Sequence, residues 1–130
     1  MAKLIQLSDL HLVSPGKLTS KVLDTNAILE ETINEILSKK DYFGQIDGLV
    51  VTGDISDDGS MESYLSAYEK LSKLNVPILV IPGNHDLRDP MRKVFHENVQ
   101  FSKNSSQFDW VFEFDETLII GLRTISPNAR

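Results

Sequence analysis

The sequence contains no cysteine among its 130 residues. The chain therefore forms no disulfide and offers no thiolate as a nucleophile or metal ligand, which fits a reducing compartment. It also has no run of about 18 apolar residues, the length that a membrane-spanning helix needs. Because a strand-like segment follows the first residues directly, we expect no signal peptide, no membrane association and a cytoplasmic location.

Positive charge is scarce as well. Lys and Arg number 13 against 19 Asp and Glu, which gives a formal net charge of −6. A surface of this sign disfavours binding to the phosphates of nucleic acids. It does not exclude a small phosphate substrate, because bound metal ions can supply the positive charge. With 41% hydrophobic and 25% charged residues, the composition is that of a globular chain, and we expect residues 1–130 to form one domain.

Short aliphatic segments alternate with amphipathic ones along most of the chain. Residues 3–7, 46–52 and 78–81 predict buried strands, whereas the helical spacing of apolar residues predicts helices over 25–40 and 61–74. The order strand, helix, strand, helix, strand is typical of an α/β fold with a parallel sheet and right-handed crossovers.

A different pattern follows a short predicted helix that ends near His96. Aromatic residues alternate with other residues there and predict a strand with one aromatic face. These aromatic residues are Phe108, Trp110, Phe112 and Phe114. A turn at Asp115 and Glu116 and a second apolar strand over 117–122 complete an antiparallel hairpin. We expect His96 to meet solvent or the helix dipole rather than to bind a ligand.

Each of the three predicted parallel strands is followed at once by polar side chains. These side chains are Asp9, His11, Asp54, Asn84, His85 and Asp86. Because the carboxyl ends of parallel strands meet at one edge of a sheet, we expect these groups to come together. Carboxylates, imidazoles and amide oxygens suit Mn, Fe or Zn. Two such ions, about 3.5–4 Å apart, can clamp a phosphoryl group and hold a hydroxide as nucleophile.

A single strand that ends in Asp is more often a capped turn than a metal site, so the prediction depends on three such ends occurring together. Gly53 allows the backbone to turn sharply before Asp54 and to approach whatever that carboxylate holds. The acidic loop that follows contains Asp57 and Asp58. We expect these two residues to be solvated loop or cap residues rather than supports of the metal site.

Three segments of the chain resemble the first three signature blocks of the calcineurin-like metallophosphoesterases. They are Asp9-x-His11, Gly53-Asp54 and Gly83-Asn84-His85-Asp86. Their surroundings look most like the class III branch of bacterial cyclic-nucleotide and glycerophosphodiester phosphodiesterases. The resemblance implies the N-terminal part of a four-layer αββα sandwich, with a βαβαβ core of parallel strands followed by the aromatic antiparallel hairpin.

The resemblance also implies the roles of the metal-binding residues. Asp9 and His11 would bind the first of two divalent ions, Asp54 would bridge both ions, and Asn84 would bind the second. In the family, further histidines from the C-terminal half complete the site, but this chain has three histidines in all. We therefore expect a domain truncated on its C-terminal side, whose bare apolar surface favours a homo-oligomer.

The remaining two residues of the third block are implied to act in catalysis. His85 would orient the phosphate and protonate the leaving oxygen, and Asp86 would hydrogen-bond His85 and fix its orientation. The predicted reaction is hydrolysis of a small phosphodiester or nucleotide, with cyclic nucleotides as candidates, by a hydroxide that bridges two metals. The alternative is a truncated, inactive remnant that binds metal or serves only a structural role.

Other α/β enzymes fit the sequence less well. A dinucleotide-binding fold calls for Gly-x-Gly-x-x-Gly after the first strand, where this chain has residues 8–11 instead. A phosphatase with an aspartyl nucleophile calls for Asp-x-Asp, but the second position is His11. A response-regulator receiver domain could use Asp9 and Asp54 but leaves Asn84 and His85 unexplained.

Overall fold

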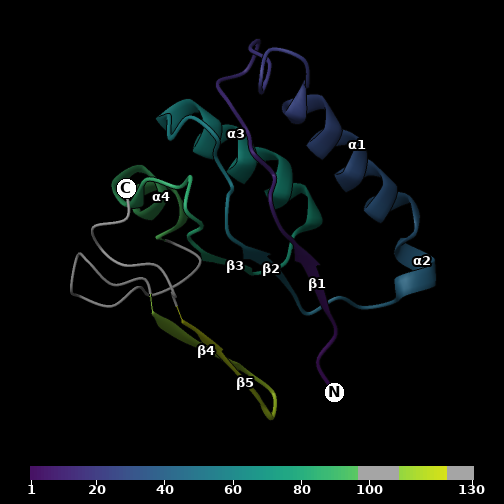
Figure 1. The fold of residues 1–130 in the computed structure, drawn as a ribbon. Helices are drawn as coiled ribbons and strands as arrows, with labels where there is room; N and C mark the ends of the chain where they lie inside the picture. The colour runs from purple at the N-terminus through teal and green to yellow at the C-terminus, as the bar shows by residue number, and fades with distance from the viewer. Residues whose placement is uncertain (97–108, 123–130) are drawn as a thin grey trace.

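The computed structural model describes residues 1–96 and 109–122, and these ranges contain a mixed α/β fold (Figure 1). The elements follow the predicted order. They are β1 (Leu4–Leu7), α1 (Thr25–Ser38), α2 (Lys40–Phe43), β2 (Gly48–Thr52), α3 (Met61–Leu71), the 3-10 helix η1 (Ser72–Leu74), β3 (Ile78–Ile81), α4 (Arg88–Phe95), β4 (Trp110–Phe114) and β5 (Thr117–Gly121). The described helices are all too short or too polar to traverse a lipid bilayer.

The first three strands form a parallel sheet, as predicted, and their order in it is β1-β2-β3. Leu7 pairs with Val51 and Val51 pairs with Val80, so all three strands end at nearly the same level. Leu49, Val51 and Leu79 are fully buried, as expected for strands covered on both faces. The register therefore brings the residues that follow the strands to one edge of the sheet.

The helices differ slightly from the sequence-based prediction. The helix expected over 25–40 ends at Ser38, and a separate short helix, α2, follows it. The helix expected over 61–74 ends as the 3-10 turn η1, which Asn75 stops in the left-handed conformation (φ 55°). Ser60 caps the start of α3, because its side chain accepts a hydrogen bond from the Ser63 amide at 3.2 Å.

The helices cover one side of the sheet, and the β4–β5 hairpin lies on the other side (Figure 1). The hairpin is antiparallel, as predicted, with Trp110 opposite Gly121; Phe108, which was expected to begin its first strand, lies outside the described residues. Trp110 is buried, and its indole Nε1–H donates to the Val80 carbonyl at 2.7 Å. This side chain attaches the hairpin to β3.

Substitution of Gly121 by Ala is expected to displace Trp110. A methyl group at residue 121 would overlap the indole ring of Trp110. Trp110 is the only tryptophan in the sequence, so it alone gives the tryptophan fluorescence. We expect a red shift of tryptophan emission and a loss of about 1–3 kcal/mol in the free energy of unfolding. Fluorescence and urea denaturation measure both. Leu118→Ala, on the exposed face of the same strand, is the control and should leave the emission unchanged.

Candidate metal centre

The candidate site begins where β1 and β2 end. The backbone continues to pair beyond the two strands: the Asp9 amide donates to the Gly53 carbonyl at 3.1 Å, and the His11 amide donates to the Asp54 carbonyl at 2.9 Å. Two threonine hydroxyls, those of Thr19 and Thr25, also donate to the His11 carbonyl. The tails of the two strands therefore remain side by side and carry their polar side chains together.

Asp9, His11 and Asp54 share an uncommon backbone conformation. Their φ angles are 57°, 49° and 51°, all in the left-handed region. Asp and His enter this region more readily than most residues, yet each such residue still costs on the order of 1–3 kcal/mol. Strain of this kind persists only where the surroundings enforce it. Here it falls on three of the four residues predicted to bind metal.

The side chains of these three residues converge on one point. Nε2 of His11 lies 3.6 Å from Oδ1 of Asp9 and 3.7 Å from Oδ2 of Asp54. The ligand atoms of the group all lie within 4.8 Å of one another. Ligands bound at about 2.1 Å to one divalent ion stand roughly 3–3.5 Å apart. The three groups therefore fit one divalent ion after small side-chain movements.

Asn84 faces the Asp54 carboxylate from the end of β3. With its nitrogen on that side, the Asn84 amide donates to Oδ1 and Oδ2 of Asp54 at 3.3 and 3.1 Å. With its oxygen on that side, a cation between the two groups is needed to separate oxygen from oxygen. The amide can therefore present a donor to Asp54 without metal and a ligand to a second ion with metal. Asn84 and Asp54 fit the second metal position in this way.

Gly83 permits the close approach of the third block to Asp54. A side chain at residue 83 would overlap both the carboxylate and the backbone nitrogen of Asp54. The His85 amide donates to Oδ1 of Asp54 at 2.9 Å, so this carboxylate is bound by two successive residues of the β3 tail. The side chain of Asp54 is only 12% exposed, whereas that of Asp9 is 64% exposed.

Asp57 lies beside two imidazole rings, not in solvent as expected. Its Oδ1 lies 3.1 Å from Nδ1 of His11 and 3.6 Å from Nδ1 of His85. An ionised carboxylate only accepts hydrogen bonds, so the proton of His11 belongs on Nδ1 and the lone pair of Nε2 faces Asp9 and Asp54. The expectation that Asp57 is a solvated loop residue is wrong: it orients a metal-ligand candidate.

Asp86 has different partners from those expected. Its Oδ1 accepts from the Ser56 amide at 3.0 Å and the Tyr64 hydroxyl at 3.0 Å, and its Oδ2 accepts from the Ile55 amide at 3.3 Å and the Gly83 amide at 2.8 Å. These four donors fill the carboxylate. They take the place of the hydrogen bond expected from His85 to Asp86, and Asp57 is the carboxylate near the His85 ring.

The buried position of Asp86 explains its electrostatics. Burial raises the pKa of the Asp86 carboxyl above its ordinary value of 3.8, while its four hydrogen bonds act in the opposite direction. Burial and then the charge of Asp86 raise the pKa of the Tyr64 phenol far above its ordinary value, so Tyr64 stays protonated and donates. Asp86 thus joins the tails of β2 and β3 behind the candidate site.

The two remaining polar residues behave as predicted. Asp58 accepts hydrogen bonds from the amide and hydroxyl of Ser60 at the start of α3. Burial acts to raise the pKa of Asp58, but hydrogen bonds from Ser60, Ser14 and Ser56 lower it overall. His96 is exposed at the end of α4, where its Nδ1 lies 2.7 Å from the Lys93 carbonyl. Neither residue belongs to a group of possible metal ligands among the described residues.

Most of the chain matches one known protein family. Residues 2–125 match the family described as calcineurin-like phosphoesterase. The chain belongs to the calcineurin-like phosphoesterase family. The resemblance drawn from the three sequence blocks is thus confirmed, and so is a hydrolase family that uses divalent metal ions.

Several curated members of the family are similar in sequence. A probable cyclic nucleotide phosphodiesterase of Coxiella burnetii is 39% identical over 114 residues, which cover 85% of this chain and 44% of the relative. A probable glycerophosphodiester phosphodiesterase of Arcobacter nitrofigilis is 36% identical over 118 residues, which cover 91% of this chain and 42% of the relative. The chain thus spans less than half the length of these phosphoesterases.

The fold agrees with the family as well. A purple acid phosphatase from yellow lupin seeds superposes with a TM-score of 0.50 at 15% identity, over 92% of this chain and 23% of the phosphatase. At this identity the similarity shows the fold alone. The α/β fold class predicted from the sequence is confirmed by the structure and by this neighbour.

Substitution of Asp57 by Asn is expected to weaken metal binding to this chain. The amide removes the charge that holds the His11 proton on Nδ1, and losing such a support typically costs about 10–100-fold in metal affinity. Titration calorimetry with Mn²⁺ measures the change. Asp47→Asn is the control, because Asp47 lies just before β2 at the opposite end of that strand. Unchanged affinity in Asp57→Asn would show that His11 needs no such partner.

Proposed function

We propose that this chain carries the metal-binding part of a phosphodiesterase that hydrolyses small phosphodiesters, with cyclic nucleotides as the first substrates to test. One observation carries the proposal. Asp9, His11 and Asp54 converge within 4.8 Å at the carboxyl edge of the parallel sheet. The relatives from Coxiella burnetii and Arcobacter nitrofigilis are probable phosphodiesterases, which supports a phosphodiester as the substrate class.

The positions of the candidate ligands support the roles that the family resemblance implies. Asp9 and His11 would hold the first ion, Asp54 would bridge, and Asn84 would hold the second. Two divalent ions in such a site polarise a phosphoryl group and supply a hydroxide for in-line attack. We propose Mn, Fe or Zn as the ions. This chain itself holds the candidate ligands Asp9, His11 and Asp54 on the hydrogen-bonded tails of β1 and β2.

His85 is the proposed proton donor. Its backbone is held by the Asp54 carboxylate, and its ring meets the His11 ring edge to face at 5.2 Å. The side chain is 40% exposed, so its imidazole is accessible to a substrate phosphate. Asp57 lies at 3.6 Å from its Nδ1 and would stabilise the protonated ring. His85 would then donate to the leaving oxygen, with Asp57 in the positioning role first assigned to Asp86.

A second candidate function is metal binding without turnover. Its support is the histidine count, because only His11, His85 and His96 occur in the sequence and His96 lies apart from the candidate ligands at the end of α4. The second metal position then has two ligand residues, Asp54 and Asn84. Two protein ligands hold a transition metal weakly compared with the three or four of established sites.

One experiment separates the two functions. Metal-free protein is titrated with Mn²⁺ by calorimetry, and the loaded protein is assayed with 3′,5′-cyclic AMP and with bis(p-nitrophenyl) phosphate. Two ions per chain with hydrolysis support the phosphodiesterase. One ion without hydrolysis supports metal binding alone. A chain that binds no Mn²⁺ would overturn both, and hydrolysis that survives Asp54→Asn would place the activity elsewhere.

Three finer expectations remain predictions that accompany the proposal. They are one metallophosphoesterase domain over 1–130, a cytoplasmic location and a homo-oligomer. The hairpin supports self-association, because Val111, Leu118 and Ile120 are more than half exposed on its outer face. Sedimentation velocity at several concentrations tests the oligomer, and a monomer throughout would contradict it.

A further inference from the structure

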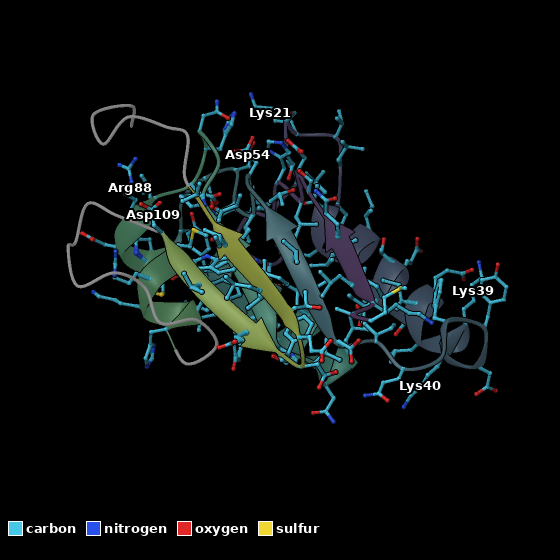
Figure 2. All side chains as sticks on the ribbon, turned by 90° about the horizontal axis from the view of Figure 1, so that it is seen from below. Lys21, Lys39, Lys40, Asp54, Arg88 and Asp109 are labelled. Carbon is cyan, nitrogen blue, oxygen red and sulfur yellow. The ribbon has the colours of Figure 1, made fainter. Side chains whose placement is uncertain are left out.

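A cavity of about 240 Å³ lies at the end of the sheet away from the candidate metal centre. It is bordered by α1, α2, η1, the starts of β1 and β2, and the loops that precede β2 and β3. Its apolar lining consists of Ile5, Ile36, Leu37, Ile46, Leu49, Leu74 and Val76. Lys40 and Asp54 lie at opposite ends of the sheet in Figure 2, so this cavity is separate from the site described above.

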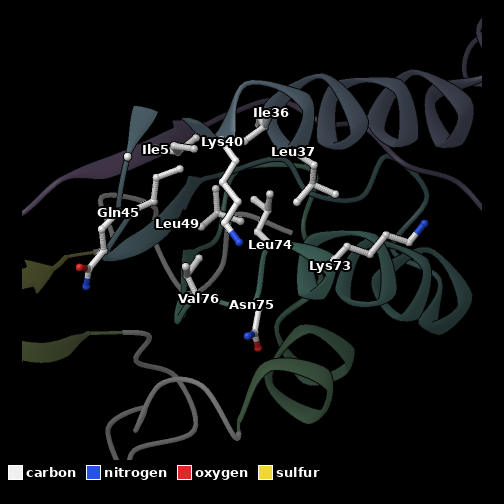
Figure 3. Close-up of a pocket in the computed structure, with 12 residues that line it drawn as sticks. Ile5, Ile36, Leu37, Lys40, Gln45, Leu49, Lys73, Leu74, Asn75 and Val76 are labelled. Atoms are coloured by element: carbon white, nitrogen blue, oxygen red, sulfur yellow. The ribbon is translucent and has the colours of Figure 1, made fainter. Parts of the chain in front are cut away.

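Two lysines line the cavity, and they differ in their partners. The ammonium of Lys73 pairs with Glu30 at 3.4 Å, and Figure 3 shows its side chain directed away from the apolar residues. The ammonium of Lys40 instead reaches over Leu49 and Leu74 (Figure 3). Among the described residues that line the cavity, none carries a carboxylate side chain. Lys40 is therefore the cation available to a ligand there.

The neighbouring residue shows what distinguishes Lys40. Lys39 precedes it directly and forms an ion pair with Glu35, with 2.7 Å between Nζ and Oε1. Within the described ranges, no such ion pair is recorded for the ammonium of Lys40. Water is the alternative partner of this charge, and an anion bound over the apolar lining would replace that water.

We propose that this cavity binds a small apolar monoanion, such as an aromatic or branched aliphatic carboxylate. The apolar body of such a ligand would bury surface against the partly exposed side chains of Ile36, Leu74 and Val76, and its carboxylate would pair with Lys40. The cavity is smaller than the roughly 300–1,000 Å³ of pockets for drug-sized ligands, so a nucleotide does not fit. The proposal does not depend on phosphodiesterase activity.

Benzoate and its neutral analogue benzamide test the inference by NMR titration of the ¹⁵N-labelled 130-residue chain. We expect benzoate to shift the amide signals of Leu74, Asn75 and Gln45, and to leave those of the Asp54 loop unchanged. Benzamide should bind about two- to fivefold more weakly, the effect of a partly exposed ion pair. EDTA should not alter either titration, because the cavity contains none of the candidate metal ligands.

Matched variants test separately the charge of Lys40 and the space in the cavity. Lys40→Met keeps the apolar stem and should reduce benzoate binding to the level of benzamide, whereas Lys39→Met should bind benzoate as the wild type does. Leu37→Trp places a larger side chain on the partly exposed rim and should abolish binding of both probes. Equal binding of benzoate to wild type and Lys40→Met, or shifts confined to the metal loops, would overturn the proposal.

Discussion

Replacement of Asp54 by Asn is expected to lower the affinity of this chain for Mn²⁺ by more than about 100-fold, beyond the effect of losing a supporting residue. Asp54 faces His11 with one carboxylate oxygen and the Asn84 amide with both. The substitution removes the negative charge from both metal positions at once. The oxygen of an Asn side chain can still accept from the His85 amide, as Oδ1 of Asp54 does at 2.9 Å, so we expect the fold to persist.

Calorimetric titration of metal-free protein with Mn²⁺ measures this loss, and circular dichroism checks the fold of the variant. Asp41→Asn is the matched control, since Asp41 is exposed on α2 and distant from the strand ends. It removes the same charge from the chain and should bind Mn²⁺ as the wild type does. Wild-type affinity in Asp54→Asn would show that the metal binds outside the three strand tails.

Replacement of Asp86 by Asn is expected to lower the free energy of unfolding by about 2–4 kcal/mol. The two oxygens of Asp86 accept from four donors, and the side chain is 3% exposed. An Asn side chain keeps one oxygen but turns an NH₂ group toward two of these donors. These two donors and the new NH₂ group then lack an acceptor in the protein interior, where water cannot supply one.

Urea denaturation followed by circular dichroism measures this change. The control is Asp89→Asn, because Asp89 is exposed in the first turn of α4 and should matter by about 0.5 kcal/mol or less. We also expect Asp86→Asn to weaken Mn²⁺ binding, since Asp86 ties the Gly83 amide to the Ile55 amide. Wild-type stability in Asp86→Asn would mean that the buried donors find other acceptors.

The sheet was predictable because its signal is local. The aliphatic run 78–81 coincides with β3, and the other two predicted strands begin one or two residues too early. Their order along the chain then fixes a parallel arrangement, since crossovers of this length cannot give a hairpin. From that topology alone, the side chains after each strand had to share one edge.

The exchanged roles of Asp57 and Asp86 were not predictable in the same way. Both are acids in polar loops, and nothing in the neighbouring residues shows which one is buried. Asp86 is buried because Tyr64, on α3, extends its hydroxyl to the tail of β3. Asp57 meets His11 because its amide donates to the Leu12 carbonyl, which continues the pairing of the two tails. Both facts depend on tertiary contacts between distant segments.

The pairing of the β1 and β2 tails has a consequence for how metal acts on the protein as a whole. An ion held by Asp9, His11 and Asp54 joins two segments that come together only on folding, so it binds the folded chain and not the unfolded one. Stability then rises with free metal as RT ln(1 + [M]/Kd), by about 2.7 kcal/mol at 100 times Kd. Metal supply would in this way set how much of the chain is folded, whether or not a substrate is present.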